Sequence, residues 1–339
     1  MYPFFRSLLF RLDPERAHGL TLGLVRLAGA LPALRALLRL WFEAPKRPVD
    51  VFGLHFTNPL GLAAGYDKDG LGWRGLACLG FGHIEVGTVT VRPQRGNPQP
   101  RLFRLPHDQA LINRMGFPGR GAEFVARQIS NRRVSGLILG VNIGKNKDTP
   151  LEQAGDDYIS LMRSFAPLAD YLTVNVSSPN TVGLRRLQGR AALNELLAEL
   201  RREKLTLETE LGRHVPVLVK LAPDLTDEEL DDALEVILTH SMDGVIATNT
   251  TISRDKLLSP HAREAGGLSG KPLFVRSLQM VSAIVQRAQG KLPVIGVGGI
   301  DSPASAQAML DAGAQLVQVY TGLIYQGPGL VKKIVGALK

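Results

Sequence analysis

Tyr171-Leu-Thr-Val-Asn-Val-Ser-Ser-Pro-Asn180 is the stretch of sequence that indicates the fold most directly. Its apolar, β-branched start, residues 171–174, predicts a buried strand. Carboxamides, hydroxyls and a proline follow at the strand's end, which is where α/β barrels and open α/β sheets bind ligands. Pro179 restricts Ser178 to extended backbone conformations, so its side chain points in a defined direction. A polar turn without function is the alternative, because Ser, Pro and Asn are common turn residues.

Apolar runs of the same kind recur after residue 50 and alternate with helical stretches. We predict eight strands, at 60–64, 83–86, 137–141, 171–176, 215–221, 244–247, 293–297 and 315–320. Helices are predicted at 191–211, 227–239, 273–288 and 302–312, and a small hairpin strand at 51–56. Eight strand–helix units predict an α/β protein with a (β/α)8 TIM barrel. A doubly wound sheet is the alternative, but the GxGxxG motif that follows its first strand is missing.

The residues that follow the predicted strands are carboxamides, lysines, hydroxyls and glycines. They are Gly65-Tyr66-Asp67-Lys68, Gly87-Thr88, Asn142, Asn175 with Ser178 and Asn180, Lys220, Thr248-Asn249, Gly298-Gly299 and Tyr320-Thr321-Gly322. Such a barrel mouth suits a flat heterocycle that carries carbonyls, N–H groups and anionic parts. Loops after the seventh and eighth strands of a barrel commonly hold a phosphate on backbone N–H groups, where a Cβ would block the approach. A tight turn without a ligand is the alternative for these glycines.

Composition excludes several classes of site. Cys78 is the only cysteine, so the chain can form neither an intramolecular disulfide nor an iron–sulfur or thiolate metal site of its own. The seven histidines lack metal-ligand spacing. The acidic residues between 224 and 232 include Thr226-Asp-Glu-Glu229, which is typical of a capping box that opens a helix. We therefore expect no metal site.

The N-terminal segment, residues 1–48, has a different character from the rest of the chain. It carries eight basic and three acidic residues, a net charge of +5 out of +9 for the whole chain. Arginines interrupt its apolar runs well short of a membrane span or a signal-peptide core. Asp13-Pro14 predicts a helix to about Gly29, and Pro32 begins a second one. We expect a module of two amphipathic helices that caps the barrel of residues 49–339, lies on a membrane surface, or does both.

With these residues placed, the chain closely resembles the dihydroorotate dehydrogenases, in particular their quinone-dependent, membrane-associated class 2. The motifs that carry the resemblance run through nearly the whole sequence in order. They are Asp13-Pro-Glu-Arg-Ala-His18, Asn58-Pro-Leu-Gly-Leu-Ala-Ala-Gly65, Asp67-Lys-Asp69, Gly87-Thr-Val-Thr90, Pro100-Arg-Leu-Phe-Arg104, Asn113-Arg-Met-Gly-Phe117, Asn142-Ile-Gly-Lys-Asn146, residues 175–180, Ala247-Thr-Asn-Thr-Thr251 and Gly296-Val-Gly-Gly-Ile300.

The resemblance implies oxidation of dihydroorotate to orotate in pyrimidine biosynthesis, by an oxidoreductase with FMN at the barrel mouth. FMN would contact Ala64, Gly65, Tyr66, Asp67, Lys68, Thr88, Asn142, Asn175, Lys220, Thr248, Gly270, Gly299, Tyr320 and Thr321. Dihydroorotate would contact Lys68, Asn113, Arg114, Met115, Gly116, Phe117, Asn175, Asn180, Asn249 and Thr250. Ser178 matches the catalytic base of this class, whereas the soluble classes have cysteine there and lack the N-terminal helices. Tyr66 and Pro118 differ from the residues expected beside these motifs.

The chain's residues suggest how the two halves of the reaction proceed. On this resemblance, Ser178 would take the C5 proton and would need a water or hydroxyl outlet, for which Thr181 and Ser177 are both open. Lys220 would stabilise negative charge that arrives on the flavin. Because neither iron–sulfur ligands nor a nicotinamide fingerprint occur, a membrane quinone is the expected oxidant, with His18, Arg104 and Tyr320 orienting its head group.

These expectations define the partners and the location of the protein. We expect a peripheral membrane protein on the cytoplasmic face of a bacterial inner membrane, held to anionic lipid, with no nucleic-acid partner and no iron–sulfur subunit. One rival is a flavin barrel that reduces uridine in RNA, although it should keep a cysteine acid and an RNA-binding domain. The other rival is a non-catalytic membrane-docking barrel, which would leave the amides and lysines at the strand ends unexplained.

Overall fold

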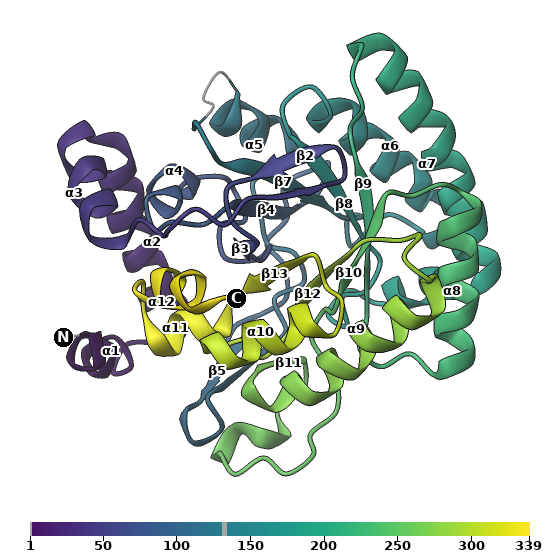
Figure 1. The fold of residues 1–339 in the computed structure, drawn as a ribbon. Coiled ribbons are helices and arrows are strands. Elements are labelled where there is room, and N and C mark those ends of the chain that lie inside the picture. The colour runs from purple at the N-terminus through teal and green to yellow at the C-terminus, as the bar shows by residue number, and fades with distance from the viewer. Residues whose placement is uncertain (1, 131–133) are drawn as a thin grey trace.

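A computed structural model describes residues 2–130 and 134–339 of the chain (Figure 1). Its centre is a closed barrel in which each strand pairs in parallel with its neighbours, in chain order, and the last strand pairs with the first. The barrel strands are β3 (Leu60–Leu62), β4 (His83–Val89), β7 (Ile138–Ile143), β8 (Tyr171–Asn175), β9 (Val217–Leu221), β10 (Gly244–Ala247), β12 (Val294–Val297) and β13 (Leu316–Val319). The predicted TIM barrel is therefore confirmed, and each predicted strand overlaps one of these.

Helices surround the barrel strands (Figure 1). They are α4 (Trp73–Ala77), α5 (Ala122–Ile129), α6 (Ala154–Phe165), α7 (Arg190–Leu211), α8 (Asp227–Thr239), α9 (Phe274–Ala288), α10 (Pro303–Asp311), α11 (Thr321–Gln326) and α12 (Leu330–Ala337). Short 3-10 helices are η1 (Pro106–Asp108), η2 (Leu151–Gln153), η3 (Leu184–Gln188), η4 (Pro260–Arg263) and η5 (Lys271–Leu273). The predicted capping box opens α8, where Thr226 Oγ1 accepts from the Glu229 N–H and the Glu229 carboxylate accepts from the Thr226 N–H.

Both faces of the barrel strands are buried, as parallel sheets require. A large apolar cluster lies between the strands and the surrounding helices. A smaller one, which includes Phe56, Leu218 and Ile295, fills the barrel interior near its amino-terminal end. The predicted hairpin, β1 (Val49–Val51) with β2 (Leu54–Phe56), contributes Phe56 to this cluster. The polar ligand site is consequently restricted to the other end of the barrel.

A three-stranded antiparallel sheet beside the barrel was not predicted. It consists of β5 (Leu102–Leu105), β6 (Ala110–Asn113) and β11 (Gly267–Gly270), with β6 in the middle. The sheet carries Arg104, Asn113 and Gly270 at fixed positions. Three residues named from separate motifs are thereby placed on one rigid element.

The N-terminal module contains three helices rather than the two predicted. They are α1 (Tyr2–Leu9), α2 (Pro14–Ala30) and α3 (Pro32–Phe42). Asp13 caps α2, as predicted, by accepting hydrogen bonds from the backbone N–H groups of Glu15 and Arg16. Helix α1 is fixed by tertiary contacts, since Tyr2 donates to the carbonyl of Ile324 and Arg6 to that of Tyr325.

The module packs closely on the barrel but exposes much apolar surface. Helix α2 approaches α4 so closely that a Cβ at Gly29 would lie 2.6 Å from the backbone nitrogen of Gly75. On the outer side, Phe4, Leu40 and Trp41 are 66%, 76% and 58% exposed. No single helix in the described ranges is long and apolar enough to cross a membrane; α2 and α3 reach such a length only together, across a bend of 109°.

Candidate active site

A cavity of about 640 Å³ lies between the barrel mouth and the N-terminal module. Strand-end residues line one end of it, and residues of α1, α2 and α3 line the other. Most of the predicted site residues meet here. They are His18, Ala64, Gly65, Tyr66, Lys68, Thr88, Arg104, Asn113, Met115, Gly116, Phe117, Asn175, Ser178, Asn180, Lys220, Thr248, Asn249, Thr250, Gly270, Gly299, Tyr320 and Thr321.

Three predicted residues do not line the cavity. Arg114 turns away from it, because its guanidinium pairs with the carboxylate of Glu264 at 2.6 Å and lies over the ring of Phe103. The Asp67 carboxylate accepts from backbone N–H groups in the loop that follows it. Asn142 lies one layer deeper and supports residues that do reach the cavity. Their assignment as direct ligands remains a prediction.

The amide side chains at the barrel mouth are hydrogen-bonded to one another in two groups. Asn175 Nδ2 donates to Thr88 Oγ1 at 3.0 Å and to Asn142 Oδ1 at 3.1 Å, and Asn249 Nδ2 donates to Asn175 Oδ1 at 3.2 Å. Across the cavity, Asn180 Nδ2 donates to Asn113 Oδ1 at 3.0 Å. These bonds fix which side of each amide presents its donor or acceptor. A planar ligand with fixed donors and acceptors would therefore meet a preorganised surface.

Ser178 is 5% exposed and lines this network. Its Oγ accepts from the backbone N–H of Asn180 at 3.2 Å. The two hydroxyls considered as its proton outlet differ in their surroundings. The Ser177 hydroxyl is engaged by Asn175 Oδ1 and Asn249 Nδ2, whereas the buried Thr181 hydroxyl has no hydrogen-bond partner among the described residues.

A buried carboxylate, Glu85, lies inside the barrel beneath the mouth. It accepts from Asn142 Nδ2 at 2.8 Å and also from the side chains of Tyr171, Thr173 and Gln318, which come from two further strands. Sequence reasoning did not assign Glu85 a role, although a charged residue inside a predicted buried strand was a usable signal. Glu85 therefore joins four strands below the amides.

Two lysines line the cavity, the buried Lys220 and the half-buried Lys68, and the pKa values of both shift for related reasons. Burial lowers the pKa of Lys220, and the negative charge of Glu85 opposes that shift. Burial likewise lowers the pKa of Lys68, and the negative charges of Glu15 and Asp69 oppose that shift. The Lys68 ammonium donates to the carbonyl of Gly65 at 2.8 Å. Each lysine therefore has a carboxylate that favours its charged form.

The loops that follow β12 and β13 form the glycine-rich cradle predicted for a phosphate. Gly298, Gly299 and Thr321 all line the cavity, and Thr321 shares a hydrogen bond of 2.9 Å with Ser269 on the neighbouring sheet. Gly299 has φ +73°, and a Cβ there would lie 2.5 Å from Phe274. Below the cradle, the buried Gln318 Oε1 lacks a partner among the described residues and is available to a ligand donor. These features fit a flavin mononucleotide.

Aromatic side chains connect this polar end with the N-terminal module. The Tyr66 ring lies edge-on to Tyr320 at 5.8 Å and to His18 at 5.1 Å. Burial, together with the charge of Lys68, lowers the pKa of His18 to about 4, so the imidazole is neutral at pH 7. Arg104 donates to the carbonyl of Leu12 at 2.7 Å and lies over the ring of Phe10. The three residues predicted to orient a quinone thus lie where the module meets the barrel.

Comparison with known proteins identifies the family. The family model described as dihydroorotate dehydrogenase matches residues 48–339. The chain belongs to the dihydroorotate dehydrogenase family. A relative named dihydroorotate dehydrogenase (quinone) from Idiomarina loihiensis is 51% identical and covers 100% of both chains. Another of that name, from Paraburkholderia phymatum, is 52% identical over 100% of this chain and 97% of its own.

Solved structures of dihydroorotate dehydrogenases share the fold. The enzyme from Eimeria tenella in complex with ferulenol superposes with a TM-score of 0.88, at 40% identity, over 96% of this chain and 90% of its own. Its ligand-free form gives a TM-score of 0.87 over 96% and 93% of the two chains. Both the family and the fold expected from the resemblance are therefore confirmed.

Proposed function

We propose that this protein is the FMN-dependent, quinone-reducing dihydroorotate dehydrogenase of its organism, which oxidises dihydroorotate to orotate. The family is flavin-dependent, and its relatives with full-length coverage carry the quinone in their names. One observation carries the proposal. A single cavity joins the amide network around Ser178 to an apolar helical module that is partly open to its surroundings.

The amides around the cavity suit the pyrimidine substrate. Asn113, Asn175, Asn180 and Asn249 present paired donors and acceptors to the imide edge and carboxylate of dihydroorotate. Lys68 adds a positive charge beside them. Because these side chains are already hydrogen-bonded to one another, they orient the substrate with little reorganisation.

Ser178 acts as the general base that removes the proton from C5 of dihydroorotate. Its hydroxyl lies in the cavity, so a substrate carbon can approach it. A serine hydroxyl needs an outlet for its own proton. We assign this role to the Thr181 hydroxyl, since the Ser177 hydroxyl is already held by two carboxamides.

The cradle and Lys220 would hold the cofactor. Gly270, Gly299 and Thr321 would surround the FMN phosphate, and Lys220 would lie against its ring system. When bound, FMN supplies the hydride-accepting ring and later releases the electrons. Lys220 is a fixed positive charge in a site shielded from water, so it stabilises negative charge where it develops.

The module formed by α1–α3 would bring the quinone to the flavin. Its outer apolar residues and net positive charge suit the surface of an anionic bilayer, and its inner residues continue the cavity. A neutral His18 can donate from one ring nitrogen to a quinone carbonyl and accept at the other from a hydroxyl of the quinol product. We place the protein on the cytoplasmic face of a bacterial inner membrane.

Rapid mixing of the purified protein tests this function. Anaerobic dihydroorotate should bleach the flavin absorbance, and a ubiquinone analogue should restore it. Mass spectrometry of the released cofactor should show FMN. A protein that is not bleached by dihydroorotate, or that releases FAD, would contradict the proposal.

A further inference from the structure

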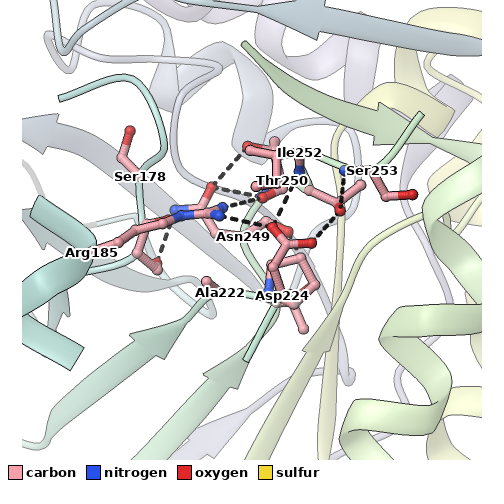
Figure 2. A network of polar contacts seen from close by, with 12 residues as sticks. Ser178, Arg185, Ala222, Asp224, Asn249, Thr250, Ile252 and Ser253 are labelled. Carbon is pink, nitrogen blue, oxygen red and sulfur yellow. Dashed lines mark hydrogen bonds and ion pairs between the residues drawn. The ribbon is translucent and has the colours of Figure 1, made fainter. Parts of the chain in front are cut away.

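The connection that carries Ser178 is tied to two neighbouring loops by the side chain of Arg185 (Figure 2). Arg185 lies in η3, between β8 and α7. Its guanidinium uses all three of its nitrogen atoms. Nε donates to the carbonyl of Ser177 at 3.0 Å, Nη1 to Asp224 Oδ2 at 2.8 Å and Nη2 to the carbonyl of Thr250 at 2.8 Å. One side chain thereby links the loops that follow β8, β9 and β10.

Other hydrogen bonds of this network are accepted by the carboxylate of Asp224. Its carboxylate accepts from the hydroxyl of Thr251 and, at 3.1 Å, from the backbone N–H of Ile252. The Arg185 and Asp224 side chains are 22% and 15% exposed. Water therefore screens this pair much less than it screens an ion pair on the open surface. A second link, from the Ala222 N–H to Gln188 Oε1 at 2.9 Å, holds the far end of η3 to the loop after β9.

The atoms that Arg185 holds lie directly beside the proposed reaction centre. Ser177 precedes Ser178, and Thr250 follows Asn249 in the chain. Asn249 Nδ2 also donates to Ser177 Oγ at 2.9 Å, so Ser177 is fixed through both its carbonyl and its hydroxyl. The Ser178 side chain points away from Arg185 (Figure 2), and neither Arg185 nor Asp224 lines the cavity. Any influence of the pair on the reaction must therefore pass through the residues that it holds.

We propose that Arg185 and Asp224 are positioning residues that hold the base Ser178 in register with the substrate contacts Asn249 and Thr250. This inference rests on the proposed function, because it assigns Ser178 as the base. The guanidinium is suited to the task since its planar donors reach three acceptors at once, whereas a lysine ammonium on a flexible stem cannot match that geometry. The pair thus couples the placement of the base to the placement of the substrate.

Stopped-flow reduction of the flavin-loaded enzyme tests the role of the pair. The variants are Arg185→Gln, Asp224→Asn, the double variant and Arg185→Lys. In Arg185→Gln, the limiting rate of bleaching at saturating dihydroorotate should fall about 10- to 100-fold, the scale expected for a small misplacement of reacting groups. Arg185→Lys should recover only part of that rate. The double variant should be little slower than the slower single variant, because both substitutions break the same unit.

Two controls separate positioning from general stabilisation. Reoxidation of the reduced flavin by a soluble quinone should remain at the wild-type rate in every variant. The second control is Asp243→Asn, which breaks the Lys204–Asp243 pair, with side chains 9% and 15% exposed, at the opposite end of the barrel. This variant should lower the thermal unfolding temperature and leave the limiting bleaching rate unchanged.

The outcomes distinguish this inference from the proposed function. Arg185 and Asp224 variants that lose stability as Asp243→Asn does, yet are bleached at the wild-type limiting rate, would overturn the positioning role alone. Should Arg185→Gln fail to fold, the limiting bleaching rate of the milder Asp224→Asn variant tests the same role. A wild-type enzyme that dihydroorotate does not bleach would overturn the proposed function, and with it this inference.

Discussion

The two ends of the cavity differ in the side chains that form them and in how deeply those side chains are buried. At the barrel mouth, side chains such as Asn175 and Asn249 are buried or half-buried and bonded to one another. At the other end, the only described residues of α1, α2 and α3 that are fully buried are Ala17 and Gly29. Polar contacts join the module to the rest of the chain, among them the Glu15–Arg101 ion pair at 2.8 Å.

The difference follows from what each end must do. Removing a proton and a hydride from one small ring requires atoms fixed to a fraction of an ångström, and a connected polar network supplies that. Under the proposed function, admitting a long apolar molecule from a bilayer requires an apolar surface, and amphipathic helices with exposed apolar side chains supply one. Four variants test the contrast, in order of expected effect.

The largest effect is expected at the mouth, from Ser178→Ala. Loss of the general base should slow bleaching of the flavin by dihydroorotate about 10²- to 10⁴-fold. Reoxidation by quinone should be unaffected, because that half-reaction uses the other end of the cavity. Ser164→Ala, which removes an exposed hydroxyl on α6, serves as the matched control. Near-normal bleaching of Ser178→Ala would remove this serine from the mechanism.

A smaller effect at the same end is expected from Lys220→Met. Loss of a preorganised charge should slow flavin reduction about 10²-fold and lower the flavin's midpoint potential, since negative charge on the reduced ring loses its partner. Potentiometric titration of the bound flavin measures this. Lys291→Met, on the exposed surface, should leave the potential unchanged. An unshifted potential in Lys220→Met would mean that this ammonium does not face the ring.

At the apolar end, the triple substitution Leu37→Ser/Leu40→Ser/Trp41→Ser should weaken binding to anionic liposomes about tenfold or more, because three exposed apolar side chains no longer enter the lipid. Flotation of the protein with liposomes measures this, and bleaching by dihydroorotate should remain normal. Leu205→Ser/Val275→Ser removes exposed apolar side chains from α7 and α9 as a control. If both variants bind liposomes equally, α3 is not the docking surface.

The smallest effect concerns acid stability at the junction of the two ends. The folded chain keeps His18 neutral down to about pH 4, whereas the unfolded chain protonates it near pH 6.5. The free energy of unfolding should therefore fall as the pH drops from 7 to 5, by about 1–2 kcal/mol from this group. Urea unfolding of His18→Gln should show a shallower fall, while the exposed His107→Gln should match the wild type. Identical slopes in His18→Gln and the wild type would contradict the burial of this imidazole.

Local patterns were sufficient to predict the barrel, because each of its strands is an apolar run that lies between turn residues and a helix. They failed for the β5, β6 and β11 sheet, whose strands do not alternate with helices as the barrel strands do. The pairing of β6 with β11 also joins positions more than 150 residues apart, for example Asn113 with Gly267. Helix α1 was missed for a similar reason, since it depends on contacts with α11.

The candidate site likewise contains residues that local patterns could locate and residues that they could not. Residues at strand ends, such as Lys220, could be located because the strand itself aims them at the mouth. The direction of Arg114 could not be predicted, because it depends on Glu264, a partner 150 residues away. Glu85 and Arg185 also escaped notice, since each acts through contacts that exist only in the closed barrel.

The hydrogen bonds of Tyr2 to Ile324 and of Arg6 to Tyr325, together with the pairing of β3 with β13, set an order of events during synthesis. Helix α1 therefore leaves the ribosome long before α11, the helix on which it docks. At about 5–20 residues per second, roughly 15–60 s separate their emergence. For that whole interval the barrel stays open and α1 lacks its docking partner, although α2 can already pack on α4. The nascent polypeptide therefore exposes the apolar side chains of α1 well before the barrel cavity exists.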